Sequence, residues 1–266
     1  LIWMLYSSSR AIAYWFEPDF VTSPEIDYIA GSPIDRLFLS ILIGIGVAIL
    51  FRRKVEFFEI IKSNRWICVL FFYMGISIFW SDYMGVSFKR WVRVTGDLIM
   101  VLIILTEADP VHAITRIFRR CAYILIPLSA LTIKYFRHIG VSYDHQGRES
   151  WIGLTTNKNQ LSQLCFIIAF FFLWILIKKY VNKQLLNDKI QSCIDIILLI
   201  FTLWMLQGSP TVQSATAVVT FIMGAFCLIT LMKLRPDPTR IWLFFVISLF
   251  FFFLISHCFH NRKEKI

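Results

Sequence analysis

Basic residues in one polar segment of the chain could hold a phosphate group. The segment "WSDYMGVSFKRWVRVTGDLIM" contains Lys89, Arg90, Arg93 and Asp97. The planar guanidinium of arginine matches the geometry of phosphate oxygens. If a helix begins near Ser87, Arg90, Arg93 and Asp97 share one helical stripe, and Arg93 and Asp97 are i, i+4 partners. In the other interpretation, Arg93 and Asp97 form a structural pair that makes a charged residue tolerable in a membrane.

A second group lies in "GLTTNKNQLSQL", residues 153–164, just before a long apolar run. Asn157 is predicted to cap a helix, with Gln160 three residues later completing a capping box. Lys158 is not explained in this way, because a helix N-terminus already carries partial positive charge. Free N–H groups beside a lysine suit an anion. Asn159 and Gln163 are predicted to form an i, i+4 polar stripe that points into the helix bundle.

A long polar loop separates these groups and holds further candidates. Arg137 and Arg148 could contribute to the same anion site. His145 with Asp144 or Glu149 could form an acid/base pair, although a lone loop histidine is more often simply solvated. A weaker polar patch at the start of a later apolar segment is predicted to pack one helix on another. It comprises Gln213, Ser214 and Thr216.

The elements that must position these residues are membrane-type helices. The chain has 266 residues, of which 58% are hydrophobic, and the surplus falls into apolar segments that are typical of membrane spans. We expect an all-α, polytopic integral membrane helix bundle of about eight spans, forming a single transmembrane domain over residues 1–266. Pro127 is expected to kink the fourth span. The predicted spans are 37–51, 66–80, 94–106, 121–136, 160–177, 194–207, 211–232 and 241–259. Residues 1–16 could end an earlier span.

Charge predicts the topology and the kind of ligand. Alternate loops that include Arg52, Arg53, Arg119 and Lys179 are the richest in basic residues and should be cytoplasmic. Residues 17–35 carry five acidic and no basic side chains, which favours the outer side. Basic residues are nevertheless retained in the outer loops. With a net charge of +10, they indicate anionic lipid or an anionic substrate, or ordinary snorkelling at the interface.

Several function classes lose support. The basic residues are dispersed among the spans, so nucleic acid is not an expected partner. The six cysteines show no CxxC spacing, so they predict neither a zinc site nor a disulfide framework. The chain has no phosphate-binding Walker loop, dinucleotide motif, HExxH or GxSxG. We expect no metal and no cofactor.

The ordered segments resemble the O-antigen ligase/polymerase superfamily of bacterial inner-membrane proteins, which includes members that act in exopolysaccharide production. The matching segments, in chain order, are "WMLYSSSRAIAYW" (3–15), "GSPIDR" (31–36), "FWSDYMGVSFKRWVRVTGDLIMVLIILTE" (79–107), "RRCAYILIPLSALTIKYF" (119–136), "GLTTNKNQLSQL" (153–164) and "QSATAVV" (213–219). Two positions depart from the family pattern: Gly140 is followed by Val141 where members often have Gly-Arg, and Ser162 stands where many have glycine.

This resemblance implies a fold related to the C-type glycosyltransferases and a site that faces the periplasm. The implied activity is that of a membrane glycosyltransferase, which takes a glycan from undecaprenyl pyrophosphate and transfers it to lipid A core or a growing polysaccharide. Basic residues would hold the pyrophosphate, and a histidine in a later periplasmic segment would act as the base. That segment has no counterpart here, and the surroundings of His260 do not match it. We therefore expect a fragment whose catalytic residue is unknown and whose activity by itself is left open.

Two other function classes remain in view. A transporter or channel for an anionic solute would use the same basic residues along a translocation path. Transporters often contain inverted repeats, and none is visible in the sequence. A structural membrane scaffold would explain the spans but leaves the outer basic residues without a role.

Overall fold

The computed structural model describes residues 1–16, 32–53, 60, 62–181 and 189–234, and this part of the chain is mostly helical. Contacts divide the chain into two compact units, unit 1 (Leu1–Arg119) and unit 2 (Arg120–Ile266). Helix α8, Pro110–Tyr135, runs through the boundary between them. A single transmembrane domain over residues 1–266 stays a prediction.

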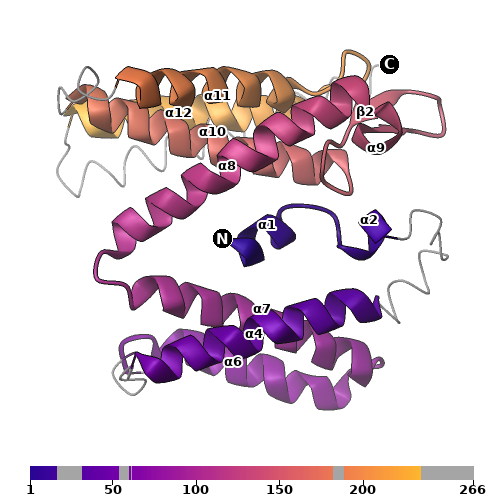
Figure 1. Ribbon diagram of the computed structural model, residues 1–266, viewed down its shortest axis with the longest axis vertical. Helices are drawn as coiled ribbons and strands as arrows, with labels where there is room; N and C mark the ends of the chain where they lie inside the picture. Colours follow the sequence, from indigo (N-terminus) through magenta and orange to yellow (C-terminus); the bar gives the residue numbers. More distant parts are fainter. Residues whose placement is uncertain (17–31, 54–59, 61, 182–188, 235–266) are drawn as a thin grey trace, which may run out of the picture. The chain divides into compact units, whose positions relative to one another are not determined.

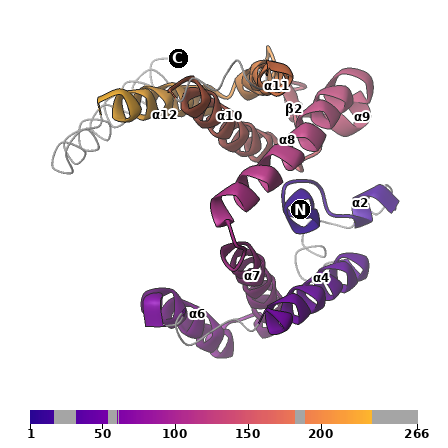
Figure 2. The same cartoon turned by 60° about the vertical axis from the view of Figure 1, so that its left-hand side comes forward.

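Unit 1 is built on two helices that run in the same direction. Its elements are α1 (Ile2–Ser7), α2 (Ala13–Phe16), α4 (Pro33–Arg52), α6 (Arg65–Ser77), the 3₁₀ turn η1 (Ile78–Trp80) and α7 (Met84–Leu105). α7 lies between α4 and α6 (Figure 2). Just after α4, Arg53 donates to the Ile103 carbonyl at 2.9 Å and pairs with Glu107 at 2.5 Å. The C-terminal ends of α4 and α7 therefore lie together.

Glycine lets these two helices approach closely. A Cβ on Gly46 of α4 would lie only 2.8 Å from the side chain of Ile99 on α7. Close backbone approach at small residues is a common way to pack helices in membranes, where the hydrophobic effect gives no driving force.

Unit 2 contains three helices in mutual contact and a small β-hairpin. Its elements after α8 are α9 (Arg137–Gly140), β1 (Val141–Tyr143), β2 (Glu149–Trp151), α10 (Lys158–Val181), α11 (Lys189–Gln207) and α12 (Ala215–Leu234). α10 packs along both α11 and α12 (Figure 1). Its inward face carries Leu161, Cys165, Ile168 and Phe172, all buried against residues of α8 and α11. β1 and β2 are antiparallel, with Val141 opposite Trp151.

The first seven predicted apolar segments each overlap a helix, and α8 continues through Pro127. Within the described residues, three helices, α4, α10 and α11, are long and apolar enough to cross a membrane, which is compatible with a membrane protein. The hairpin was not foreseen, since its residues were expected to form a loop. Three predictions fall outside the described residues: the eighth span, most of the acidic segment 17–35, and the statement on His260.

Candidate anion-binding site

Arg93 and Asp97 lie on α7 as predicted, but they do not pair. α7 begins at Met84, three residues before the expected start, so the predicted stripe is helical throughout. The Asp97 carboxylate instead accepts a hydrogen bond from the Trp3 indole at 2.7 Å. The Arg93 guanidinium lies over the Tyr6 ring, 6.0 Å from its centroid. Among the described residues no ion pair joins Arg93 to Asp97, whose Oδ1 is held by the indole of α1.

Tyr6 links Arg93 to the start of α4. Its ring packs on Phe38, with 5.5 Å between the centroids, and its hydroxyl donates to the Asp35 carboxylate. A tyrosine hydroxyl is protonated at neutral pH, so it remains a donor to this carboxylate. Lys89 and Arg90 are exposed on the same helix, α7, as Arg93.

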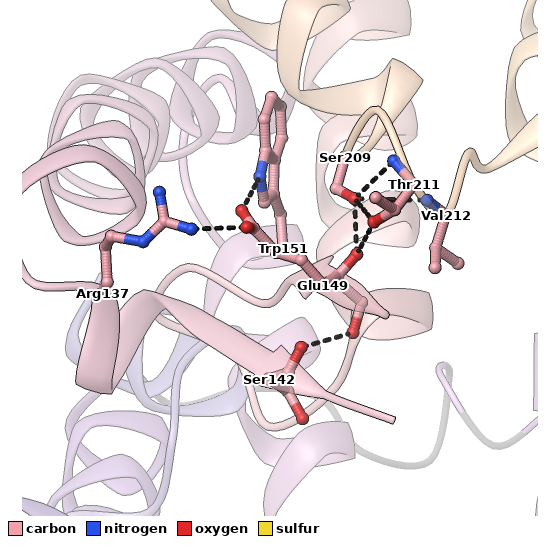
Figure 3. A network of polar contacts seen from close by, with 8 residues as sticks. Arg137, Ser142, Glu149, Trp151, Ser209, Thr211 and Val212 are labelled. Carbon is pink, nitrogen blue, oxygen red and sulfur yellow. Dashed lines mark hydrogen bonds and ion pairs between the residues drawn. The ribbon is translucent and has the colours of Figure 1, made fainter. Parts of the chain in front are cut away.

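In unit 2, Arg137 is held in a polar network at the hairpin (Figure 3). It pairs with the Glu149 carboxylate, whose other oxygen accepts a hydrogen bond from the Trp151 indole at 3.2 Å. The pKa of Arg137 is raised, mainly by its hydrogen bond to Tyr143 and then by the charge of Glu149. Unlike Arg93, Arg137 has a full carboxylate counter-charge.

The same network fastens the hairpin to the segment between α11 and α12. The hydroxyls of Ser209 and Thr211 both donate to the backbone carbonyl of Glu149 (Figure 3). Ser209 is fully buried. The loop after α8 and the loop after α11 therefore lie at one end of unit 2, as the predicted alternation of spans requires.

Arg148, the other loop arginine, pairs with Asp144 at 3.1 Å. Asp144 also accepts the backbone N–H of His145 at 2.7 Å, and this bond, followed by Arg148, lowers the pKa of Asp144. Among the described residues no hydrogen bond joins the His145 ring to Asp144 or Glu149, and both carboxylates pair with arginines. The His145 side chain is exposed.

Lys158 is the first residue of α10 and is exposed. The cap is confirmed, since the Asn157 side chain accepts the Gln160 N–H at 2.9 Å. The reciprocal half of the capping box is shifted by one residue, because Gln160 accepts from the N–H and hydroxyl of Thr156 instead of the Asn157 N–H. No ion pair involves Lys158 in the part of the chain that the structure describes.

The turn before Lys158 is fixed on α8 by a glycine. Gly153 has a φ of +54°, and a Cβ there would lie 2.9 Å from the Ser129 side chain. The Ser129 hydroxyl accepts the Leu154 N–H at 3.4 Å, and the hydroxyl of buried Thr155 donates to the Ile152 carbonyl at 2.7 Å. A left-handed glycine packed this tightly could have been suspected from its place before a cap, but its contacts lie across the fold.

The predicted inward stripe on α10 is wrong within unit 2. Asn159 and Gln163 are both exposed, since the packed face of α10 is taken by Leu161 and Cys165. Ser162, which stands where the family resemblance predicts glycine, shares a hydrogen bond of 2.8 Å with Ser214 just before α12. The helix-packing role predicted for the Gln213–Thr216 patch is confirmed at Ser214.

A buried charged network escaped the sequence interpretation. Asp195 of α11 is fully buried and lies 3.4 Å from the Lys179 ammonium of α10, which also donates to Ser192 at 3.1 Å. The Tyr123 hydroxyl of α8 donates to Asp195 at 2.9 Å. The signal was a single acid in an otherwise apolar run, which demands a buried partner. Lys179 was assigned to a cytoplasmic loop instead.

The structure thus sorts the nominated residues by their surroundings. Arg137 and Arg148 are paired with carboxylates, whereas Arg93 and Lys158 have none among the described residues. Arg90 and Arg93 belong to unit 1 and Lys158 to unit 2, so their predicted approach to one another stays a prediction. Comparison with known proteins adds no assignment, because no family model, curated protein or solved structure matches this chain.

Proposed function

We propose that this chain belongs to the glycan-transfer machinery of the bacterial inner membrane. It would cross the membrane about eight times, with a fold related to the C-type glycosyltransferases. The site would face the periplasm and take a glycan from undecaprenyl pyrophosphate for transfer to a lipid or saccharide acceptor. The ordered series of matching segments supports this proposal, as do three helices of membrane-spanning length and composition.

The observation that carries the proposal is the state of Arg93. It is exposed, and among the described residues it has an aromatic partner but no carboxylate. A guanidinium in this state can accept a diphosphate without first losing an ion pair. Lys158, exposed in the first turn of α10, adds a second cation beside the backbone N–H groups of that turn.

These residues would act on the leaving group. The acceptor hydroxyl attacks the anomeric carbon of the glycan, loses its proton to a base, and displaces the pyrophosphate oxygen. Arg90, Arg93 and Lys158 would stabilise the negative charge that develops on undecaprenyl pyrophosphate. The base is not assigned to a residue of this chain. Arg137 and Arg148 would contribute less, because each must leave its carboxylate before it binds a phosphate.

The test compares matched lysines at two helix starts. Lys158 and Lys189 are both exposed first residues of long apolar helices, α10 and α11. The chain is expressed in its natural reading frame, and the glycan product is followed on gels. We expect Lys158→Ala to lower transfer by about 100-fold or more, as loss of a charge-stabilising donor does, with Lys189→Ala unaffected.

The arginine arm uses Arg93→Ala with Arg116→Ala as the control, because Arg116 is an exposed arginine of α8, close in sequence to Arg119 and in the same region predicted to be cytoplasmic. Membrane insertion should be equal in all four variants. Unchanged product in both Lys158→Ala and Arg93→Ala would remove the glycan-transfer assignment. Uptake of an anionic solute by reconstituted protein, without any lipid-linked glycan, would favour a transporter instead.

A further inference from the structure

The indole of Trp3 fills the space that Gly96 leaves because glycine has no side chain. Trp3 is buried in unit 1, with 8% of its surface exposed. A Cβ on Gly96 of α7 would lie 2.4 Å from the Trp3 ring, so only glycine leaves room for the indole there. From this position the Trp3 Nε1 reaches the Asp97 carboxylate at 2.7 Å. Gly96 and Trp3 together determine the partner of Asp97.

This contact bears on whether the Arg93 guanidinium is available to bind an anion. Arg93 and Asp97 are four residues apart on α7, the spacing at which opposite charges on a helix attract. An arginine paired with its own helix neighbour has to give up that pair to bind an anion. The indole holds Asp97 Oδ1 while the guanidinium lies over the Tyr6 ring, so in this arrangement the neighbouring carboxylate does not engage Arg93.

Tyr6, from the same short helix α1, provides the other half of the setting. Its ring receives the Arg93 guanidinium, and its own position is fixed by Phe38 and by the hydrogen bond to Asp35. Asp35 in turn accepts the Ile12 N–H at 2.9 Å. An aromatic ring attracts a cation but offers no oxygen acceptor to its N–H donors. The donors of Arg93 therefore remain available for an oxyanion.

We propose that Trp3 and Tyr6 are positioning residues that hold Arg93 ready for a phosphate oxyanion, Trp3 by retaining Asp97 and Tyr6 by supporting the guanidinium. Neither residue touches the anion itself. The inference rests on the proposed role of Arg93 and adds that α1 controls it. It also gives a reason for glycine at position 96, because a larger residue there would collide with the Trp3 indole.

The experiment measures binding of inorganic pyrophosphate to the purified full chain in detergent by calorimetry. Trp3→Phe keeps an aromatic ring but frees Asp97 to pair with Arg93, and we expect about two- to fivefold weaker binding, the range for an exposed charge pair. Trp3→Phe combined with Asp97→Asn should recover the original affinity, because the freed carboxylate is gone. Trp91→Phe is the matched control, since Trp91 also lies on unit 1 and donates to a backbone carbonyl.

The Tyr6 arm separates the ring from the hydroxyl. Tyr6→Phe should bind pyrophosphate nearly as well as the original chain, whereas Tyr6→Leu should bind more weakly. If Trp3→Phe fails to fold, Gly96→Ala serves the same purpose by displacing the indole. A second titration in nanodiscs, with and without phosphatidylglycerol, shows whether a lipid headgroup competes for the same site or free diphosphate is preferred.

The outcomes distinguish this inference from the proposed function. If Arg93→Ala leaves pyrophosphate binding unchanged, the assignment of Arg93 fails, and with it the proposed site. If Arg93→Ala weakens binding but Trp3→Phe does not, Arg93 stands and the role of α1 is overturned. A Trp3→Phe defect that Asp97→Asn does not repair would also overturn it, because it would report general damage to unit 1.

Discussion

Arg93 in unit 1 and Arg137 in unit 2 are both arginines next to aromatic residues, yet their charges are in different states. Arg137 pairs with Glu149, twelve residues further along the chain. Arg93 has an acid only four residues away on its own helix, and the two do not pair. Spacing in the sequence alone would have predicted an ion pair between Arg93 and Asp97 and none between Arg137 and Glu149.

Whether a charged side chain is available for a ligand therefore depends on residues from other elements of the fold. In unit 1, a tryptophan from α1 holds one oxygen of Asp97, and Arg93 lies over the Tyr6 ring instead of pairing with that carboxylate. At the hairpin, the antiparallel pairing of β1 with β2 brings Glu149 opposite Tyr143 and within reach of Arg137. Unit 2 uses its nominated arginines to hold its own loop, whereas unit 1 leaves Arg93 with an aromatic support.

The largest effect is expected at the pair of Asp195 and Lys179, which tests whether the charges of unit 2 have a structural role. Asp195→Leu leaves the partly buried Lys179 ammonium without its counter-charge, and we expect a loss of unfolding free energy toward the lower end of the about 3–5 kcal/mol typical of a broken buried pair. Denaturant unfolding in detergent measures it. Lys179→Met added to Asp195→Leu should recover most of the loss, since a well-packed apolar replacement of both partners is often neutral. A single variant as stable as the original chain would show that this pair does not hold the helices.

Lys158 is the exception in unit 2, and its position depends on the turn before it. Gly153→Ala puts a Cβ against Ser129 at a φ of +54°, and we expect about 1–3 kcal/mol of destabilisation. Gly44→Ala is the control, because Gly44 lies within α4 and has open space around it. If both variants unfold at the same denaturant concentration, the turn does not depend on glycine, and Gly153 does not determine the position of Lys158.

The sequence predicted the helices well, because apolar runs of this length have few alternatives. It also predicted the Asn157 cap, which depends only on neighbouring residues. It missed what depends on distant contacts. The β1–β2 hairpin has too few residues for a periodic signal, and the shift of the capping box to Thr156 depends on how the turn packs.

The site shows the same division between near and distant contacts. The residue types alone nominated the basic residues, but they did not predict which side chains those residues would contact. Trp3 lies 94 residues from Asp97, and Tyr123 lies 72 residues from Asp195. No local pattern could have linked either pair, although the isolated acid at position 195 could have been flagged as needing one.

A single substitution should make Arg137 resemble Arg93. Glu149→Gln removes the counter-charge but keeps the side-chain shape, the carbonyl that Ser209 and Thr211 use, and an oxygen for the Trp151 indole. In an Arg93→Ala background, we expect pyrophosphate binding to rise about two- to fivefold on Glu149→Gln, as release from an exposed pair allows. Adding Arg137→Ala should remove the gain. A gain that survives without Arg137 would mean that the carboxylate acts at long range on another cation.

The smallest expected effect concerns Arg148 and tests how strongly Asp144 holds it. The pKa of Asp144 is lowered first by the His145 N–H and only then by Arg148. Since this pKa is depressed in the folded chain, the turn gains stability above the ordinary value of about 4 and loses it as the pH falls through the folded pKa. The amide signal of His145, followed by NMR, should therefore titrate below that value. In Arg148→Ala the midpoint should rise only part of the way, because the backbone bond remains. A full return to the ordinary value would show that the ion pair with Arg148 alone lowers this pKa, and that Asp144 holds Arg148 more firmly than the order of causes implies.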